Sequence, residues 1–404
     1  MAGSYVLDSK LFNENSSDWD TLKASFVARG LRVIDPKDGE YAIVRYDRTL
    51  STDGVKDDQK LFRSVVYKKD SASVVCLAPP KSCVLSEAEW PLKATTVQDF
   101  VDGVMINVFW HGESEAQVVT RSRLGADNKF YSELSFLEML KQAVPDLETL
   151  KPFAEQNTQF VSLVLQHKSN RVVTEVVEPR VYVVHSGFVN ADGSVHVEEN
   201  SAEWLPQIQS LAVPSRTVSA ESLATLEALT ADVQEQSSTL GYMWQGYCLK
   251  DGAGKRWRIR NKEYSQVKSL RGNESDSVAR FCRLRSSRSL KRYLKFYPED
   301  ETTFYKLEGG LRQATRKLLG LYVDTFKFKK QEFSTLVWPY KHHVSVLHNQ
   351  FKDVLKPQKK TVDLAYVIEY INGLSVEDMS NLYKEPKPKR VVAATVPTVP
   401  TVSA

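Results

Sequence analysis

The sequence predicts an α+β fold in which packed antiparallel sheets are followed by an α-helical C-terminal domain. Short segments that alternate apolar and polar residues fill roughly residues 30–200, and this period of two is typical of half-buried strands. From about Thr302 to Leu382 the apolar residues recur instead at helical spacing. With 404 residues, of which 42% are hydrophobic, the chain can form two or three domains with their own cores. We therefore predict a first domain over residues 1–300 and a helical domain over 301–384.

In chain order, strand patterning occurs in "YAIVRYD", "RSVVYKKD", "SVVCLA", "GVMINVFW", "QVVTRSRL", "FVSLVLQH" and "PRVYVVHSGFV". Helices are predicted at "ELSFLEMLKQAV" and at "SAESLATLEALTADVQEQ", the second with Ser219 as its N-cap. Strand patterning then returns in "GYMWQGYCLKD", "KRWRIRN" and "RFCRLR". Helical spacing follows in "LRQATRKLLGLYVDTFK", "HHVSVLHNQFKDVL" and "LAYVIEYINGL". The Pro, Val and Thr repetition of residues 385–404 cannot bury a core and predicts a disordered tail.

Positive charge is concentrated in one part of the chain. The net charge is only +4, but residues 241–330 hold 22 Lys and Arg against 9 Asp and Glu. Aromatic residues interleave with these cations, namely Trp257, Tyr264, Phe281, Tyr293, Phe296 and Tyr297. Basic groups neutralise phosphates and aromatic faces accept stacked bases, so this composition predicts a surface for single-stranded nucleic acid. The predicted contacts are Arg256, Trp257, Lys268 and Arg271; the alternative is a solvated face of alternating strands.

Several classes of protein are disfavoured by the sequence. No apolar run approaches the roughly 18 residues of a membrane span, and "MAGSYVLDSKLF" lacks the features of a secretion signal. The four cysteines are scattered, and the histidines at 342, 343 and 348 have no Cys or acid cluster beside them, so we predict neither disulfides nor a metal site. An intracellular protein of the cytoplasm or the nucleus is expected, without a membrane partner.

The order of the strand motifs resembles that of a known enzyme family. The segments "RSVVYKKDSASVVCLAPPKS", "DFVDGVMINVFW", "VVTRSRLGA", "LVLQHKSNRVV", "WQGYCLKD" and "WRIRNKEY" are similar to those of ATP-dependent RNA ligases of the phage RNA ligase 1 type, and to RNA-ligase-like proteins of large DNA viruses. The resemblance covers roughly residues 30–300. It implies a nucleotidyltransferase fold, RNA as the partner, and a place in a virus-infected host cell or a virion.

The residues that carry the chemistry of such ligases are altered here. In that family a lysine two residues before an Asp-Gly pair attacks the α-phosphate of ATP. Asp102 and Gly103 match the pair, but Phe100 stands at the lysine position, and a phenyl ring cannot form a phosphoramidate. Gln245 replaces the metal-binding glutamate beside Gly246, and "FVSLVLQH" contains no acid where the family has one. The resemblance therefore predicts no catalytic residue.

Cations of the family's nucleotide site are retained. The resemblance implies nucleotide or phosphate contacts for Arg63, Lys81, Arg121, Arg123, Arg171, Gln245, Arg258 and Arg260. Retained cations with missing acids suit an anion-binding surface better than Mg²⁺-assisted phosphoryl transfer, which needs carboxylates. No cofactor is assigned with certainty; ATP and Mg²⁺ are candidates if nucleotide binding persists. We expect one cleft to be lined by Phe100, Lys81, Gln245, Arg258 and Arg260.

Three functions are left open by the sequence. The first is an RNA-ligase-like protein that binds nucleic acid, chiefly single-stranded RNA, without ligating it. The second is an active ligase whose nucleophile has moved to Lys68, Lys69 or Lys93, and the third is a structural or assembly protein that reuses the fold. The missing acids favour the first over the second, and the basic aromatic stretch favours the first over the third.

Overall fold

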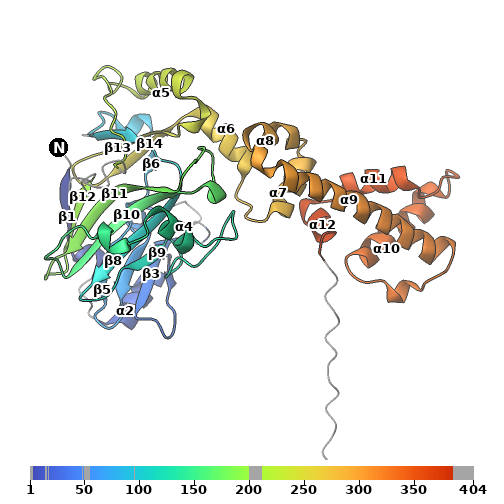
Figure 1. Cartoon of the computed structure of the whole chain (residues 1–404), viewed down its shortest axis with the longest axis horizontal. Helices are drawn as coiled ribbons and strands as arrows, with labels where there is room; N and C mark the ends of the chain where they lie inside the picture. Colours follow the sequence, from blue (N-terminus) through green and yellow to red (C-terminus); the bar gives the residue numbers. More distant parts are fainter. Residues whose placement is uncertain are drawn as a thin grey trace, which may run out of the picture. The chain divides into compact units, whose positions relative to one another are not determined.

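The computed structural model describes residues 3–13, 16, 18–47, 49, 55–94, 96–199 and 212–384. The chain divides into two compact units, Met1–Arg271 and Gly272–Ala404 (Figure 1). This division lies before residue 300, where the sequence analysis places the end of the first domain; the domain limits at 300 and 384 stay predictions. The predicted disordered tail lies outside the described residues. Among the described helices, none is both long enough and apolar enough to cross a membrane.

The described strands of the N-terminal unit form three sheets. A six-stranded antiparallel sheet has the order β1-β12-β11-β10-β8-β9, and a four-stranded antiparallel sheet has the order β2-β3-β4-β5. The third sheet, β6-β14-β13-β7, is antiparallel except for its parallel edge strand β6. The strands are β1 Ser4–Leu7, β2 Leu31–Ile34, β3 Tyr41–Tyr46, β4 Val65–Lys68, β5 Ser73–Leu77, β6 Cys83–Val84, β7 Thr96–Asp99, β8 Val104–His111, β9 Gln117–Thr120, β10 Thr158–Gln166, β11 Arg180–Val189, β12 Val195–Glu199, β13 Gly246–Lys250 and β14 Arg256–Arg260.

The N-terminal unit also contains helices, which pack on its sheets, and a second set of helices forms the C-terminal unit. Those of the N-terminal unit are α1 Lys10–Asn13, α2 Trp19–Ala28, α3 Asp57–Lys60, α4 Phe136–Ala143, α5 Leu226–Leu240 and α6 Lys262–Arg271. Those of the C-terminal unit are α7 Ser277–Ser286, α8 Leu290–Phe296, α9 Glu301–Tyr322, α10 Tyr340–Gln350, α11 Leu364–Asn372 and α12 Val376–Asn381. The predicted fold class, α+β with packed antiparallel sheets and C-terminal helices, is confirmed.

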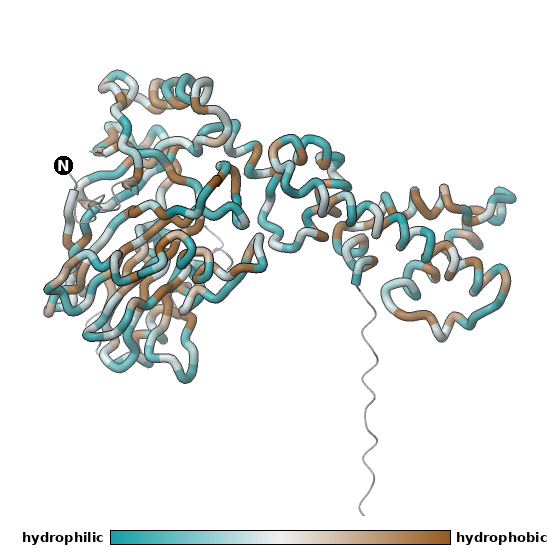
Figure 2. Tube along the Cα trace, viewed as in Figure 1, coloured by the Kyte–Doolittle hydropathy of each residue, from teal (hydrophilic) through white to brown (hydrophobic). Residues whose placement is uncertain are grey.

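Both faces of the six-stranded sheet are covered, which explains why its central strands are so apolar. On β8, Ile106 and Trp110 face the core beneath α4, where they pack with Met139. The intervening Phe109 faces the opposite core, which the β2–β5 sheet closes and which includes Phe160. Figure 2 shows hydrophobic colour along much of these strands. The period of two predicted from "GVMINVFW" therefore separates two cores, not a core from solvent.

The β13–β14 sheet has one apolar face and one cationic face. Helix α5 covers the apolar face, where Leu229 packs with Leu249 and Trp257. Strand alternation places the side chains at 256, 258 and 260 on the other face. Helix α5 begins at Leu226 with Thr225 as its N-cap, so the prediction of Ser219 as the cap is wrong. Ser219 instead caps the preceding turn, where its hydroxyl accepts from the Ser222 N–H at 3.0 Å.

The prediction of a strand at "RFCRLR" is also wrong, because these residues lie in α7. Asp276 caps this helix by accepting from the Val278 N–H at 3.0 Å, and Phe281 and Leu284 are buried one turn apart on the same face. A run of six residues is too short for its apolar spacing to distinguish a strand from a helix, so the capping residue just before it decides for the helix. Helical structure therefore begins earlier than predicted.

Several of the aromatic residues expected to stack on bases are core residues in the structure. Phe281, Tyr293 and Tyr297 are fully buried, and Tyr293 stacks on Tyr297 with ring centroids 4.6 Å apart. Phe281 packs edge-on against Phe304 at 5.7 Å. These rings hold α7, α8 and α9 together and cannot accept bases, so this part of the nucleic-acid surface prediction is corrected.

The arginines of α7 are likewise used inside the C-terminal unit. The guanidinium of Arg280 lies 3.3 Å from a carboxylate oxygen of Asp300, and that of Arg283 lies 2.7 Å from Glu274. Arg285 contacts Glu308 at 2.9 Å. The local excess of positive charge predicted a nucleic-acid surface, with a solvated face as the alternative, but three of its cations neutralise carboxylates of neighbouring elements.

A buried ion pair joins the six-stranded sheet to the β13–β14 sheet. The Lys250 ammonium donates to the carboxylate of Glu199 at the end of β12, and the Tyr5 hydroxyl of β1 donates to the other oxygen at 3.5 Å. Burial acts to raise the pKa of Glu199, but the charges of Lys250 and Arg256 outweigh it and hold this pKa below its ordinary value. Glu199 is therefore the counter-ion of two buried cations.

We expect Glu199→Gln to lower the free energy of unfolding by about 3–5 kcal/mol, because the two cations lose their counter-ion inside the protein. Because the pKa of Glu199 is lower in the folded than in the unfolded protein, its ionised form stabilises the fold at pH values above the ordinary glutamate pKa. This contribution is lost as pH falls through the lowered pKa. The stability of the variant should therefore decline less than that of wild type as the pH becomes acid. Urea unfolding at several pH values measures both effects, with the half-exposed neighbour variant Glu198→Gln as control. Equal losses in the two variants would contradict the assignment.

Candidate functional site

One pocket of the N-terminal unit gathers residues that the sequence analysis singled out from distant segments. We call it the central pocket; its volume is about 160 Å³. It lies among the turn between β7 and β8, the start of β13, the cationic face of β14, and α6. The predicted site residues that line it are Arg63, Phe100, Asp102, Gly103, Gln245, Arg256, Arg260 and Lys268.

The Asp-Gly pair forms the turn between β7 and β8 and holds it in place. Gly103 has φ +147°, and a Cβ atom there would lie 2.5 Å from the Leu165 carbonyl oxygen, so only glycine allows β10 to approach this closely. The carboxylate of Asp102 accepts from the N–H groups of Val173 and Thr174 at 2.9 and 3.0 Å. Its other oxygen accepts from the Tyr264 hydroxyl of α6 at 2.7 Å. Asp102 and Gly103 thus lie in a turn before a strand, and the carboxylate of Asp102 holds this turn against its neighbours.

Phe100 closes one side of the central pocket. Its N–H donates to the Gly246 carbonyl at 2.8 Å, which joins this turn to β13. The Arg260 guanidinium lies 5.6 Å from the centre of the Phe100 ring, within the range of a cation–π contact. At the position that the sequence analysis compares with the ligase lysine, a ring therefore packs against a cation.

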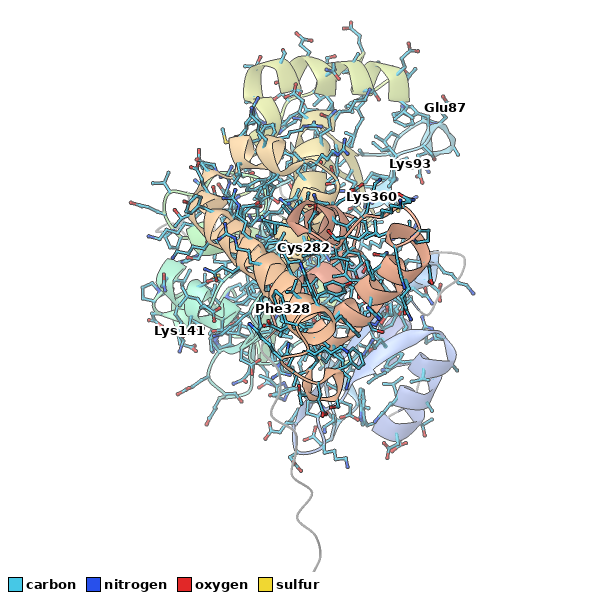
Figure 3. The ribbon with its side chains drawn as sticks, turned by 90° about the vertical axis from the view of Figure 1, so that its right-hand side faces the viewer. Glu87, Lys93, Lys141, Cys282, Phe328 and Lys360 are labelled. Atoms are coloured by element: carbon cyan, nitrogen blue, oxygen red, sulfur yellow. The ribbon has the colours of Figure 1, made fainter. Side chains whose placement is uncertain are left out.

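The three lysines considered as relocated nucleophiles lie elsewhere among the described residues. Lys68 contacts Asp70 at 3.3 Å, in the hairpin turn between β4 and β5. Lys69 contacts Asp35 at 3.2 Å. Lys93 is exposed, and Figure 3 labels it among the side chains of the N-terminal unit. None of the three lines the central pocket.

Both carboxylates that line the central pocket are engaged by protein groups. Asp99 accepts from Nε and Nη2 of Arg216 at 2.7 and 2.8 Å, and from Trp244 Nε1 at 2.9 Å. Asp102 is held as described above. Among the described residues there is no group of three or more His, Cys, Asp or Glu side chains that could hold a metal ion. The donor set of this pocket therefore does not fit Mg²⁺, which prefers carboxylate oxygens.

The same pocket contains buried hydrogen-bond donors without a partner. Nε and Nη1 of Arg256 and Nε2 of Gln98 are buried and make no hydrogen bond within the described part of the chain. Burial, followed by the charge of Arg256, lowers the pKa of the Arg63 guanidinium to about 10. Burial likewise lowers the pKa of Lys268, whose ammonium lies 3.5 Å from the Tyr264 hydroxyl. Buried donors and close cations are costly unless an acceptor reaches them, and an oxyanion would supply both acceptor and charge.

Lys81 lines a second pocket at the turn between β13 and β14, which we call the hairpin pocket. Its volume is about 310 Å³, and its other cations are Lys60, Lys255 and Arg256. The Lys81 ammonium lies 5.5 Å from the centre of the Tyr46 ring, and the Arg121 guanidinium lies 4.4 Å from the same ring. Arg256 lines both pockets, so the two pockets have this cation in common.

The remaining predicted phosphate contacts are held away from the central pocket. Arg258 donates to the backbone carbonyl of Ser82 and, at 2.9 Å, to its hydroxyl. Arg123 is exposed and makes a two-point contact with Asp127 at 2.6 and 3.1 Å. Arg171 is buried and donates to the Val173 carbonyl at 3.0 Å. Of the residues expected to line a single cleft, Phe100, Gln245 and Arg260 line the central pocket. Lys81 and Arg258 do not line it.

Three of the four predicted nucleic-acid contacts, Arg256, Trp257 and Arg271, are buried. Trp257 belongs to the core beneath α5, and its Nε1 donates to Glu89 at 2.8 Å. Arg271 ends α6 and lies 4.5 Å from the centre of the Tyr131 ring. Alternation along β14 sends Trp257 to the face opposite Arg256, so the two cannot form one stacking surface.

The sequence analysis missed Gln98, Asp99 and Cys248. Gln98 lies two residues before Phe100, and Cys248 lies two residues after Gly246. Period-two alternation from these recognised positions would have placed both on the cationic face. Asp99 has no such signal, because its role depends on Arg216, 117 residues away.

We expect Asp102→Ala to lower the free energy of unfolding by about 3 kcal/mol, since two backbone N–H groups and a buried hydroxyl lose their acceptor. Urea unfolding measures the loss. Asp127→Ala, which removes an exposed carboxylate, is the control and should unfold close to wild type. If both variants lose the same stability, Asp102 does not hold the site together.

Comparisons with known proteins give structural similarity alone. No protein-family model and no curated protein sequence matches the chain. Among solved structures, it is similar to two structures of an archaeal ATP-dependent RNA ligase, described as form 1 and form 2, with 13% and 14% identity and TM-scores of 0.42 and 0.38. Each alignment covers 75% of this chain and 78% of the other. A putative ATP-dependent DNA ligase from Aquifex aeolicus is similar with 13% identity and a TM-score of 0.39, over 83% of this chain and 80% of that one.

Proposed function

We propose that this chain is an RNA-ligase-like protein that binds single-stranded nucleic acid, chiefly RNA, through its phosphates and does not ligate it. The observation that carries the proposal is the lining of the central pocket. Phe100 stands where the family's nucleophilic lysine would be, both carboxylates are engaged, and four cations remain. Such a lining retains affinity for phosphate and lacks the groups for adenylyl transfer.

The size and charge of the central pocket favour a phosphate group over a whole nucleotide. Its volume of about 160 Å³ is below the roughly 300 Å³ at which small-molecule sites begin. A phosphate oxygen that enters would find the unpartnered donors of Arg256 and Gln98. Arg260 is exposed and Lys268 half-buried, so both can approach the charge from the opening.

The arrangement of the two pockets favours a strand over a free phosphate ion. The central and hairpin pockets share Arg256, and the hairpin pocket adds Lys60, Lys81 and Lys255. Successive phosphates of a flexible strand could therefore meet successive cations. Contacts of this kind position a strand and carry little sequence information.

The order of sequence motifs supports a relation to phage RNA ligase 1-type ligases and to their counterparts in large DNA viruses. On this proposal the chain is a pseudoenzyme of a virus-infected cell or a virion. Its Asp-Gly turn is kept because Asp102 organises the pocket, and the lysine is lost because the chemistry is no longer used.

The wild-type protein and the variant Phe100→Lys should both fail to form a covalent adenylate. The restored amine would still lack carboxylates to hold Mg²⁺, a contribution worth several kcal/mol of transition-state stabilisation. Incubation with radiolabelled ATP and Mg²⁺, followed by denaturing electrophoresis, is the measurement. A stable wild-type adduct mapped to Lys68, Lys69 or Lys93 would establish an active enzyme instead.

Binding of a short single-stranded RNA should weaken steeply with salt, and Arg260→Ala and Lys268→Ala should each reduce the salt slope by about 0.7. Burial lowers the pKa of Lys268, so the contribution of Lys268 should disappear at a lower pH than that of an exposed lysine as pH rises. Fluorescence titration at several salt concentrations and pH values measures both. Lys93→Ala, which removes an exposed charge outside the pockets, is the matched control. RNA binding that is absent at low salt would favour a structural or assembly role.

A further inference from the structure

The C-terminal unit has a net positive charge, whereas the N-terminal unit has a net negative one. The central pocket, which lies in the N-terminal unit, does not explain what this positive charge binds. Residues Gly272–Ala404 hold 23 Lys and Arg against 14 Asp and Glu, whereas Met1–Arg271 holds 31 against 36. Several arginines of α7 are neutralised internally, as described above. The cations available to a partner must therefore be sought on other elements of this unit.

Exposed aromatic rings and lysines occur together in the connection between α9 and α10. We call residues 327–341 the aromatic loop; it is visible at the end of α9 in Figure 1, and Figure 3 labels Phe328. Phe328 is 56% exposed and Trp338 is 53% exposed. These values contrast with the buried aromatic rings of α7 and α8.

Each exposed ring has an ammonium group close to its face. Lys327 and Lys330 lie 5.7 and 5.1 Å from the centre of the Phe328 ring. Lys384, at the end of the described chain, lies 5.9 Å from the centre of the Trp338 ring. Cation–π contacts at these distances keep the charges beside the rings. A planar group on the ring and a phosphate attached to it could thus be bound together.

Polar contacts connect the aromatic loop to the preceding turn and join its two ends. The Lys330 N–H donates to the Asp324 carbonyl at 2.7 Å, and Gln331 Nε2 donates to the Thr325 hydroxyl at 3.3 Å. Lys341 closes the loop by donating to the Ser334 carbonyl at 3.2 Å. A loop ordered before binding loses less conformational entropy when a partner binds.

We propose that the aromatic loop is a second binding surface for single-stranded nucleic acid, independent of the central pocket. Bases stack on Phe328 and Trp338, and the adjacent lysines bind the phosphates on either side. Stacking on exposed rings accepts every base, so this surface binds without sequence preference. Binding at this surface does not require a ligand in the central pocket. A change that abolishes binding at one surface should therefore leave binding at the other intact.

The distribution of exposed apolar side chains in the aromatic loop distinguishes this partner from an anionic membrane. A membrane-docking element presents a continuous apolar face, usually that of an amphipathic helix. Here the exposed apolar side chains are Phe328 at one place and Val337 with Trp338 at another, and the segment between them contains the exposed polar residues Ser334 and Thr335. Rings interleaved with cations match a chain of alternating bases and phosphates.

Photo-crosslinking of the full chain to a short single-stranded RNA that contains iodouridine tests the proposal without any variant. Iodouridine crosslinks to aromatic rings on which it stacks, so peptide mapping should find adducts at Phe328 or Trp338. In titrations with the same RNA, Phe328→Ser and Trp338→Ser should each weaken binding about tenfold. Lys327→Gln with Lys330→Gln keeps the rings and should reduce the salt slope.

Tyr305→Ser is the matched control, because Tyr305 is an 81% exposed aromatic residue on α9 outside the aromatic loop, and it should leave binding unchanged. The loop variants should weaken binding equally in wild type and in Arg260→Ala, which separates this surface from the central pocket. Crosslinks confined to the N-terminal unit, with unchanged affinity in the loop variants, would overturn the proposal. Loss of sedimentation with phosphatidylserine vesicles in the same variants, with RNA binding intact, would overturn it in favour of a membrane.

Discussion

The carboxylate of Asp102 is the constraint on which the central pocket depends. It joins the turn after β7 to the backbone of Val173 and Thr174 and to Tyr264 of α6. Gly103 allows this turn to lie directly against β10. Phe100 and Lys268 reach one pocket because the elements that carry them meet at this carboxylate. A charge buried with three donors is stable, and it is thereby withdrawn from metal binding.

A second constraint is the balance of buried charge around Arg256. Glu199 is the counter-ion for Lys250 and contributes to the environment of Arg256, yet two N–H groups of Arg256 have no acceptor in the described structure. A folded protein tolerates such donors at a cost, and sites that bind an anion are where this cost is recovered. Because Arg256 lines both pockets, an anion in either one would change the field in the other.

The two units use aromatic residues in opposite ways. In α7 and α8 the rings hold helices together and the arginines neutralise carboxylates, although their sequence is the more typical of a nucleic-acid surface. In the aromatic loop the rings are exposed and the lysines lie beside them. Composition alone does not distinguish these cases, because both stretches interleave basic and aromatic residues. Burial decides, and it depends on which elements pack together.

The sequence by itself determined the strand and helix types over most of the chain, because period two and helical spacing follow from backbone geometry. It also determined the Asp-Gly turn and the absence of a lysine at Phe100. Only the tertiary structure decided that Trp257 and Arg271 are buried, and that Lys81 and Arg258 do not line the central pocket. These outcomes depend on contacts such as Asp99 with Arg216 and Trp257 with Glu89, which join residues more than a hundred positions apart and have no local signal in the sequence.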